Sequence, residues 1–334
     1  MTGRPVAIIG AGSWGTALAI VLAPRFERIR LWGREADLVE RLFSSRVNDV
    51  FLPGFALPLN VEPTADIGYA LDGAQTVIGV MPSRFARALY REMLPHLHAE
   101  MRFVSATKGL EQGTLLRMSE VARVVIGEKF EPRVAVLSGP TFAREVANGS
   151  PTAVVIASED RELAAAIQRE FSGPTFRLYM NGDPVGVELG AALKNVIAIG
   201  AGVCHGLGLG NNTLAALITR GLAEITRLAA ALGGQPKTLA GLAGLGDLVL
   251  TCNGELSRNR TVGIELAKGR RLAEIVGSMT MIAEGVETTA AACDLAARSG
   301  ISMPIAGQMD AILSGRISAR EAIRELMERE LKAE

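Results

Sequence analysis

Two patterns of hydrophobic and polar positions divide the chain. In the first half, short apolar runs rich in Val and Ile alternate with longer stretches of helical period. Such alternation predicts right-handed strand–helix–strand units and a mainly parallel sheet. We expect strands at Val6–Ile9, Ile29–Trp32, Val77–Val80, Arg102–Ser105, Val134–Leu137, Ala153–Ile156 and Phe176–Tyr179.

The pattern changes after Asn181-Gly182-Asp183-Pro184, a succession of turn-forming residues. Beyond this segment strand-like runs nearly vanish, and Ala-, Leu- and Gly-rich helical patterns continue to the last residue. We therefore predict an α/β domain over residues 1–183 and an all-helical domain over residues 184–334. The charged segment Arg320–Glu334 is typical of an exposed helix.

Composition narrows the class of protein. The chain has 334 residues, of which 49% are hydrophobic, and its formal net charge is zero. This length and apolar content support two cores, and the charge balance argues against nucleic acid as a partner. No apolar run approaches about 18 residues without Gly or a charge, so we expect no membrane span. The apolar segment Pro5–Pro24 is interrupted by glycines, which favours a strand and helix over a signal peptide.

The cysteines and histidines indicate neither a disulfide framework nor a metal site. Cys204, Cys252 and Cys293 lie far apart, form no CxxC pair and are odd in number. None of the three histidines has companions at the spacing of metal ligands. This cysteine usage is typical of a reducing compartment, and we expect the cytoplasm.

The segment 6–19 has the pattern of a strand, a GxGxxG turn and a helix. Gly10 permits the tight turn, Gly12 lets the backbone approach a pyrophosphate, and Gly15 allows helix and strand to pack closely. The helix N-terminus adds oriented N–H groups. A Gly-rich structural turn is the alternative, but the position at the start of an α/β half favours dinucleotide binding.

The second predicted strand ends at Trp32-Gly33-Arg34. Folds that prefer NAD usually place Asp or Glu near this point to bind the ribose 2′-hydroxyl, whereas a guanidinium suits a 2′-phosphate. Arg34 therefore predicts a preference for NADP(H). The neighbouring Glu35 keeps NAD(H) open, and a solvated surface arginine is the alternative.

Two single charges stand within long apolar segments. Lys194 is the only formally charged residue in 189–219, and Asp247 is the only one in 238–254. Lysine is rarely buried without a partner, and an ammonium in apolar surroundings releases its proton more readily, so Lys194 is a candidate proton donor or acceptor. The alternatives are a lysine whose end reaches water and an aspartate that caps a helix. The opposite signs favour pairing.

Other polar segments are candidates for binding an anion. Ser257, Arg258 and Asn259 lie at a predicted helix start, where side-chain and backbone donors can bind phosphate, although a basic turn is the alternative. Met279 and Met281 are expected in the core. Glu284 is open between a helix entry and a cofactor contact.

Lys108 and the segment Ser138-Gly139-Pro140-Thr141 each follow a predicted strand of the first half. Ligands of open α/β sheets bind beyond the carboxyl ends of the strands, so both segments are placed to meet substrate or nicotinamide. For Pro140 and Thr141, a simple helix start is the alternative.

These motifs together resemble bacterial glycerol-3-phosphate dehydrogenases [NAD(P)+], and the resemblance extends through nearly the whole chain. It implies an N-terminal Rossmann domain with a mainly parallel sheet, followed by an all-α domain like the C-terminal domain of 6-phosphogluconate dehydrogenase. The matching segments are GAGSWGTALA (10–19), LWGR (31–34), FLPG (51–54), MPS (81–83), ATKGLE (106–111), SGPTFAREVA (138–147), ELGAALKNVIAIGAG (188–202), NNTLAALITRGLAE (211–224), GLAGLGDLVLTC (241–252), SRNR (257–260) and EGVETT (284–289).

The resemblance also implies residue roles. Lys194 is similar to the family's catalytic proton donor or acceptor, Asp247 would hold it, and Lys108 would touch both substrate and cofactor. The implied substrate contacts are Lys108, Gly139, Thr141, Lys194, Asp247, Ser257, Arg258 and Asn259. The implied cofactor contacts are Gly10, Gly12, Ser13, Trp14, Gly15, Arg34, Lys108, Ala143, Arg258, Ile282 and Glu284. Thr141 stands where Ser is common in the family, and Ile282 where Val is common.

The implied reaction is the reversible NAD(P)H-dependent reduction of dihydroxyacetone phosphate to sn-glycerol 3-phosphate, which supplies phospholipid synthesis. Abundant apolar helical surface favours a homodimer. Two other functions stay open at this point. One is a two-domain reductase acting on a carboxylate substrate, and the other is a non-catalytic protein that senses NADP(H).

Overall fold

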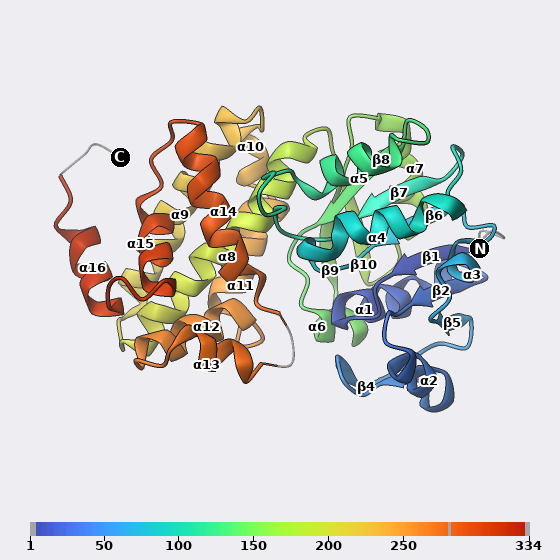
Figure 1. Cartoon of the computed structure of the whole chain (residues 1–334), viewed down its shortest axis with the longest axis horizontal. Coiled ribbons are helices and arrows are strands. Elements are labelled where there is room, and N and C mark those ends of the chain that lie inside the picture. Colours follow the sequence, from blue (N-terminus) through green and yellow to red (C-terminus); the bar gives the residue numbers. More distant parts are fainter. Residues whose placement is uncertain (1–4, 280–281, 331–334) are drawn as a thin grey trace. The chain divides into compact units, whose positions relative to one another are not determined.

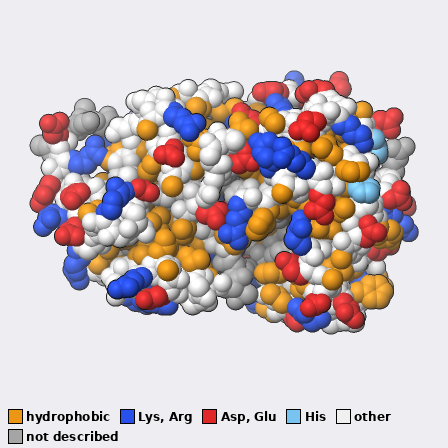
Figure 2. Space-filling model, in the orientation of Figure 1, with side chains coloured by type: hydrophobic (Ala, Val, Ile, Leu, Met, Phe, Trp, Pro, Cys, Tyr) orange, Lys and Arg blue, Asp and Glu red, His pale blue; other side chains and the backbone are white. Residues whose placement is uncertain are grey.

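The computed structural model describes residues 5–279 and 282–330, so Met281 lies outside the described residues. The chain forms two compact units (Figure 1). Unit 1 comprises Met1–Lys108 and Leu116–Pro184, and unit 2 comprises Gly109–Leu115 and Val185–Glu334. On the face shown in Figure 2, acidic and basic side chains are intermingled, as expected for a chain of zero net charge.

Within the described part of unit 1, eight strands form one sheet in the order β10-β9-β8-β7-β6-β1-β2-β5. Its strands are β1 (Val6–Ile9), β2 (Ile29–Trp32), β5 (Val61–Thr64), β6 (Thr76–Gly79), β7 (Arg102–Ser105), β8 (Arg133–Ser138), β9 (Thr152–Ala157) and β10 (Phe176–Asn181). Neighbouring strands pair in parallel except β8 and β9, so β9 and β10 run opposite to the other strands. The mainly parallel sheet is therefore confirmed.

The expected strands all form, but β5 was missed. Its sequence, Val61-Glu62-Pro63-Thr64, alternates buried and half-buried positions instead of forming an apolar run. Pro63 is tolerated because β5 is the edge strand next to β2, where fewer ladder hydrogen bonds are needed. Polar composition and a proline therefore hid a real strand.

Helices cover both faces of the sheet because the side chains of its strands alternate in direction. Val6 and Ile8 pack into one core, and Ala7 and Ile9 pack into the other. The helices of the first core are α1 (Ser13–Leu22), α2 (Ala36–Ser45), α6 (Ala143–Ala147) and α7 (Arg161–Phe171). Those of the second are α3 (Ile67–Leu71), α4 (Ala86–Met93) and α5 (Met118–Ile126). Short 3₁₀ turns lie at Ala23–Arg25, Ser83–Phe85 and Leu94–His96.

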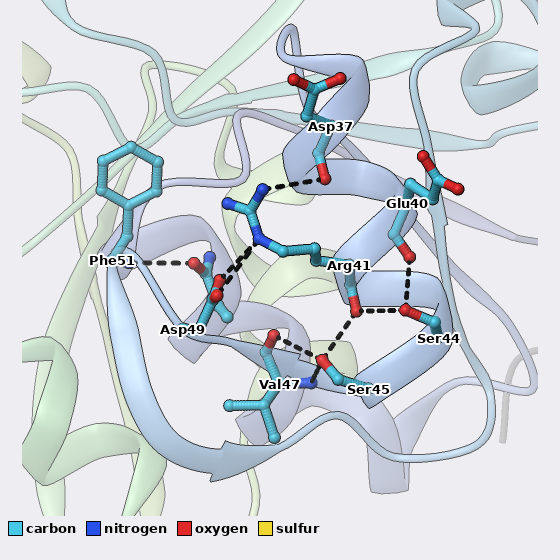
Figure 3. A network of polar contacts seen from close by, with 9 residues as sticks. Asp37, Glu40, Arg41, Ser44, Ser45, Val47, Asp49 and Phe51 are labelled. Atoms are coloured by element: carbon cyan, nitrogen blue, oxygen red, sulfur yellow. Dashed lines mark hydrogen bonds and ion pairs between the residues drawn. The ribbon is translucent and has the colours of Figure 1, made fainter.

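A small hairpin of β3 (Val47–Asn48) and β4 (Leu52–Ala56), also missed from the sequence, follows α2. Figure 3 shows how the last turn of α2 joins it. The Arg41 guanidinium donates to the Asp49 carboxylate at 3.2 Å, and the Ser45 hydroxyl donates to the Arg41 carbonyl at 2.7 Å. These contacts are exposed, so each contributes little to stability, but they orient the chain that leads into the hairpin.

Unit 2 has no strand among its described residues, which confirms the all-helical second domain. Its helices are α8 (Pro184–Gly206), α9 (Asn211–Ala231), α10 (Pro236–Leu239), a π-helix (Leu242–Gly246), α11 (Asp247–Asn253), α12 (Arg258–Ala267), α13 (Leu272–Gly277), α14 (Glu284–Arg298), α15 (Pro304–Leu313) and α16 (Ala319–Met327). The exposed helix expected at 320–334 is α16, and residues 331–334 lie outside the described part.

Helix α8 is long and apolar enough to cross a membrane by length and composition, but its apolar window is entirely buried inside the protein. It is the core helix of unit 2, where its Leu, Ile and Val side chains pack against α9, α14 and α15. Glycine allows α12 to approach it closely, since a Cβ on Gly263 would lie 1.9 Å from the carbonyl oxygen of Ile199. Small residues thus supply packing that the few aromatic residues do not.

Candidate active site

The glycine-rich turn between β1 and α1 has the geometry that its sequence predicts. Gly10 has a φ of 126°, and a Cβ there would lie 2.6 Å from the Val80 carbonyl oxygen. A Cβ on Gly15 would lie 1.8 Å from the Gly10 carbonyl oxygen, whereas a Cβ on Gly12 would meet nothing within 4 Å. Gly12 also precedes α1 without a capping side chain. The turn therefore leaves room for an anion beside the first N–H groups of α1.

Asn48, which sequence reasoning did not single out, supports this turn. It is fully buried, and its side-chain amide donates at 2.8 Å to both the Ala11 carbonyl and the Thr16 hydroxyl. Its own amide oxygen accepts from the Phe51 N–H at 3.0 Å. A buried amide with three hydrogen bonds holds the glycine turn to the hairpin. The only feature of the sequence that could have pointed to Asn48 is its position three residues before the FLPG segment.

Several polar atoms near the expected cofactor site are left without partners. Among the residues that the structure describes, the Trp14 indole N–H and the hydroxyls of Ser105 and Ser138 are buried and lack hydrogen-bond partners. Ser105 and Ser138 end β7 and β8, on the sheet edge where ligands of this architecture bind. Trp14 lies in the first turn of α1 beside Ser13. Unpaired buried donors are costly, so these atoms fit a site that a polar ligand completes.

Arg34 lies two residues after β2 and is already paired. Its Nη2 is 2.9 Å from Oε2 of Glu92 on α4, and its guanidinium carbon is 5.4 Å from the centre of the Trp32 ring. The side chains of Arg34 and Glu92 are both substantially exposed. Glu35 is the N-cap residue of α2, where its side chain makes no capping hydrogen bond. Glu92 was not among the residues singled out from the sequence.

Lys108 is held at the carboxyl end of the sheet. Its Nζ donates to the Gly139 carbonyl at 3.1 Å and lies 3.3 Å from the Thr141 hydroxyl. Gly139 has a φ of 141°, and a Cβ there would lie 3.1 Å from the backbone of Val154. Thr141 does not start a helix, because α6 begins at Ala143 with Phe142 as its N-cap. Lys108 and the 138–141 segment thus form one polar cluster in unit 1.

Lys194 and Asp247 form a buried ion pair in unit 2. The ammonium also donates to the Thr251 hydroxyl at 2.8 Å, and that hydroxyl donates to the Asp247 carbonyl at 2.6 Å. The side chains are only 7% and 1% exposed. Asp247 is the first residue of α11, and no side chain caps that helix. The pairing expected from the opposite charges is therefore found, and Lys194 does not extend into water.

The neighbouring thiol does not compete with this lysine as a reactive group. Burial raises the pKa of Cys252 to about 12, although the Lys194 ammonium partly opposes that effect. A thiol with such a pKa is essentially never a thiolate near neutral pH. In the described residues no group of three or more His, Cys, Asp or Glu side chains could hold a metal ion.

A second polar cluster of unit 2 surrounds the start of α12. The Ser257 hydroxyl caps this helix by accepting from the Arg260 N–H at 3.3 Å. Arg258 donates to the Ile282 carbonyl at 2.7 Å, and Asn259 accepts from the Gly285 N–H at 2.9 Å. The helix start expected from the sequence is therefore confirmed.

Glu284 is the first residue of α14, two residues after Ile282, so the helix-entry interpretation is correct for its position. The contact between Arg258 and Ile282 brings together three residues expected to touch the cofactor: Arg258, Ile282 and Glu284.

Comparisons with known proteins match this organisation. The family models described as NAD-dependent glycerol-3-phosphate dehydrogenase N-terminus and C-terminus match residues 5–164 and 183–324. The chain is 58% identical to a glycerol-3-phosphate dehydrogenase [NAD(P)+] of Koribacter versatilis, with 97% of both chains covered. It is 51% identical to the protein of that name from Geobacter sulfurreducens, with 98% of both chains covered.

Solved structures extend the comparison. A crystal structure of glycerol-3-phosphate dehydrogenase from Coxiella burnetii has a TM-score of 0.94 at 40% identity and covers 98% of this chain and 99% of its own. A ketopantoate reductase from Ralstonia eutropha, at 17% identity and a TM-score of 0.61, covers 96% of this chain and 99% of its own. At that identity only the fold is shared.

Proposed function

The chain belongs to the NAD-dependent glycerol-3-phosphate dehydrogenase family, and we propose that it catalyses the reversible reduction of dihydroxyacetone phosphate to sn-glycerol 3-phosphate. The names of its relatives support this reaction. The observation that carries the proposal is the buried Lys194–Asp247 pair, because a protonated amine in an apolar helix is the group that carbonyl reduction needs. The product would supply phospholipid synthesis.

Lys194 is the proposed proton donor. As the C2 carbonyl is reduced, negative charge develops on its oxygen, and the Lys194 ammonium gives a proton to that oxygen. In the reverse direction the neutral amine accepts the proton from the C2 hydroxyl. Asp247 and Thr251 keep Nζ in one place, because each binds it directly. Fixed geometry of this kind lowers the reorganisation needed during proton transfer.

The remaining substrate contacts are proposed for two clusters. Ser257, Arg258 and Asn259 would bind the phosphate at the start of α12, so that binding energy remote from the carbonyl orients it. Lys108, supported by Gly139 and Thr141, would add positive charge near the reacting oxygen.

NAD(P)H, when bound, supplies the hydride that reduces C2. The residues proposed to hold it in unit 1 are Gly10, Gly12, Ser13, Trp14, Gly15, Arg34, Lys108 and Ala143. Those proposed in unit 2 are Arg258, Ile282 and Glu284. The open side of Gly12 and the unpartnered Trp14 indole N–H support the assignment.

We further propose that NADP(H) is preferred over NAD(H). Arg34 supports this preference, since it follows β2 at the position where a guanidinium can bind a 2′-phosphate. Dissociation constants of the purified protein for NADPH and NADH test it, and equal values would contradict it.

The domain division, assembly and compartment are also proposals. Residues 1–183 would form the cofactor domain, and residues 184–334 the substrate and catalytic domain. Exposed apolar side chains in unit 2, such as Leu256 and Val276, support a homodimer. Light scattering during gel filtration would test that state. The free cysteines support the cytoplasm as the compartment.

The substitution Lys194→Ala tests the proposed reaction. NADPH oxidation, followed by absorbance with dihydroxyacetone phosphate, should fall by about 10²- to 10⁴-fold in kcat, while NADPH binding is retained. A near wild-type kcat would refute the role of Lys194. Activity of the wild type with a 2- or 3-oxo acid in place of dihydroxyacetone phosphate would favour a carboxylate reductase instead.

A further inference from the structure

The Arg34–Glu92 pair joins two elements that the sequence separates by 58 residues. Arg34 follows β2, and Glu92 lies in the last turn of α4 (Ala86–Met93). A single distance of 2.9 Å, between Nη2 and Oε2, defines both a hydrogen bond and an ion pair. The guanidinium that we assign to a 2′-phosphate therefore already binds a carboxylate.

The position of Glu92 gives it no benefit from its own helix. A carboxylate in the last turn faces the negative end of the helix dipole, which disfavours its charge. The favourable partner is supplied from outside, by Arg34. Replacing Glu92 should therefore cost α4 little.

The pair is weak enough to be displaced. The Arg34 side chain is 57% exposed and that of Glu92 is 44% exposed, so water screens their attraction. A phosphate monoester carries about −1.5 to −2 charges near neutral pH and offers three acceptor oxygens, against a single negative charge on the carboxylate. A phosphate can thus take the guanidinium from Glu92, but it must first overcome the existing contact.

We propose that Glu92 is a specificity-determining residue, which occupies the Arg34 guanidinium in the free protein and makes a ribose 2′-phosphate compete for it. Glu92 thereby weakens NADPH binding and leaves NADH binding unchanged, because NADH carries a 2′-hydroxyl without charge. The protein consequently discriminates less between the two cofactors than Arg34 alone would allow. This inference rests on the proposed function of Arg34.

The test is the dissociation constant of each cofactor, measured by energy transfer from the two tryptophans to the reduced nicotinamide at low salt. In Glu92→Gln, NADPH should bind about three- to tenfold more tightly and NADH should change less than about twofold. The gain should shrink at about 0.5 M salt, where charge interactions are screened. Glu159→Gln is the matched control, since it removes the carboxylate of another exposed pair, 3.6 Å from Arg123, and should change neither constant.

The variant Arg34→Gln separates failure of this inference from failure of the assignment on which it rests. If Arg34→Gln weakens NADPH binding alone, and Glu92→Gln tightens NADPH binding when Arg34 is present but has no effect in the Arg34→Gln background, both stand. If Arg34→Gln leaves the ratio of the two constants unchanged, the proposed role of Arg34 fails. If Arg34 matters but Glu92→Gln has no effect, weakens NADPH binding, or changes both cofactors equally, the competition by Glu92 is refuted.

Discussion

Breaking the buried pair of unit 2 from one side should cost far more stability than replacing both partners. In Asp247→Leu the Lys194 ammonium stays buried without its carboxylate, and in Lys194→Met the Asp247 carboxylate is left without its ammonium. In the double variant both charges are gone and two apolar side chains fill similar space. Removing one member of a buried pair typically costs about 3 to 5 kcal/mol, whereas apolar replacement of both is often neutral.

The structure places the expected cost of each single change near the lower end of that range. With side chains 7% and 1% exposed, solvent offers almost no compensation to the charge that remains. The Thr251 hydroxyl, 2.8 Å from the Lys194 Nζ and 3.4 Å from Asp247 Oδ1, can still form a hydrogen bond with whichever charged group remains. We therefore expect about 3 kcal/mol for each single variant. At about 2 to 4 °C per kcal/mol for a domain of this size, Tm should fall by roughly 6 to 12 °C.

Urea unfolding of the wild type, the two single variants and the double variant, followed by circular dichroism without cofactor, gives the four free energies of unfolding for a double-mutant cycle. The double variant should lie within about 1.5 kcal/mol of the wild type. Glu159→Gln, which breaks an exposed pair with Arg123, should change stability by less than about 1 kcal/mol and serves as the control. If the single costs were below about 1 kcal/mol, or simply added in the double variant, the pair would not be the buried, coupled unit described here.

Three further predictions concern other sites. Gly263→Ala should lower the free energy of unfolding of unit 2, measured in urea, by at least about 2 kcal/mol, because the new Cβ would lie 1.9 Å from a backbone oxygen of α8. The control is Gly307→Ala in α15, where a Cβ would meet nothing within 4 Å; this change should be neutral or stabilising by up to about 1 kcal/mol. Burial raises the pKa of Glu224 in the native protein, so the protonated carboxyl contributes fully to stability below about pH 4.5, and this contribution is lost as pH rises through the higher native pKa. The Tm of Glu224→Gln should therefore depend less on pH above about pH 4.5 than the Tm of the wild type. Burial raises the pKa of Cys252 to about 12 and that of Cys293 to about 11, so alkylation at pH 8 should be slow in the native protein and fast in urea, and rapid native labelling of either would contradict this.

Local sequence predicted much of the architecture. The strands of unit 1 other than β5 and the small hairpin followed from short apolar runs bounded by turn residues, because a strand buried on both faces needs an apolar side chain at nearly every position. The glycine spacing of the first turn predicted a geometry that the φ of Gly10 and the open side of Gly12 confirm. Edge strand β5 escaped because a half-buried position admits Glu62, and its place at the edge of the sheet tolerates Pro63.

For the single charges of the second half, the sequence predicted part of the result and the tertiary structure decided the rest. Lys194 and Asp247 stood out because a charge in an apolar segment is costly unless it is paired. Their opposite signs favoured a pair, but only the packing of α11 against α8 shows that it forms, with Thr251 as a third member.

Asn48 and Glu92 show what tertiary structure alone decided. An asparagine before a loop and a glutamate in an amphipathic helix are locally ordinary, so nothing in their surroundings along the chain distinguishes them. The fold buries Asn48 against the glycine turn and brings Glu92 to Arg34. Periodicity reports which face of an element is buried, because that depends on near neighbours. Which side chains meet depends on contacts between residues distant in sequence, and these form only when whole elements pack.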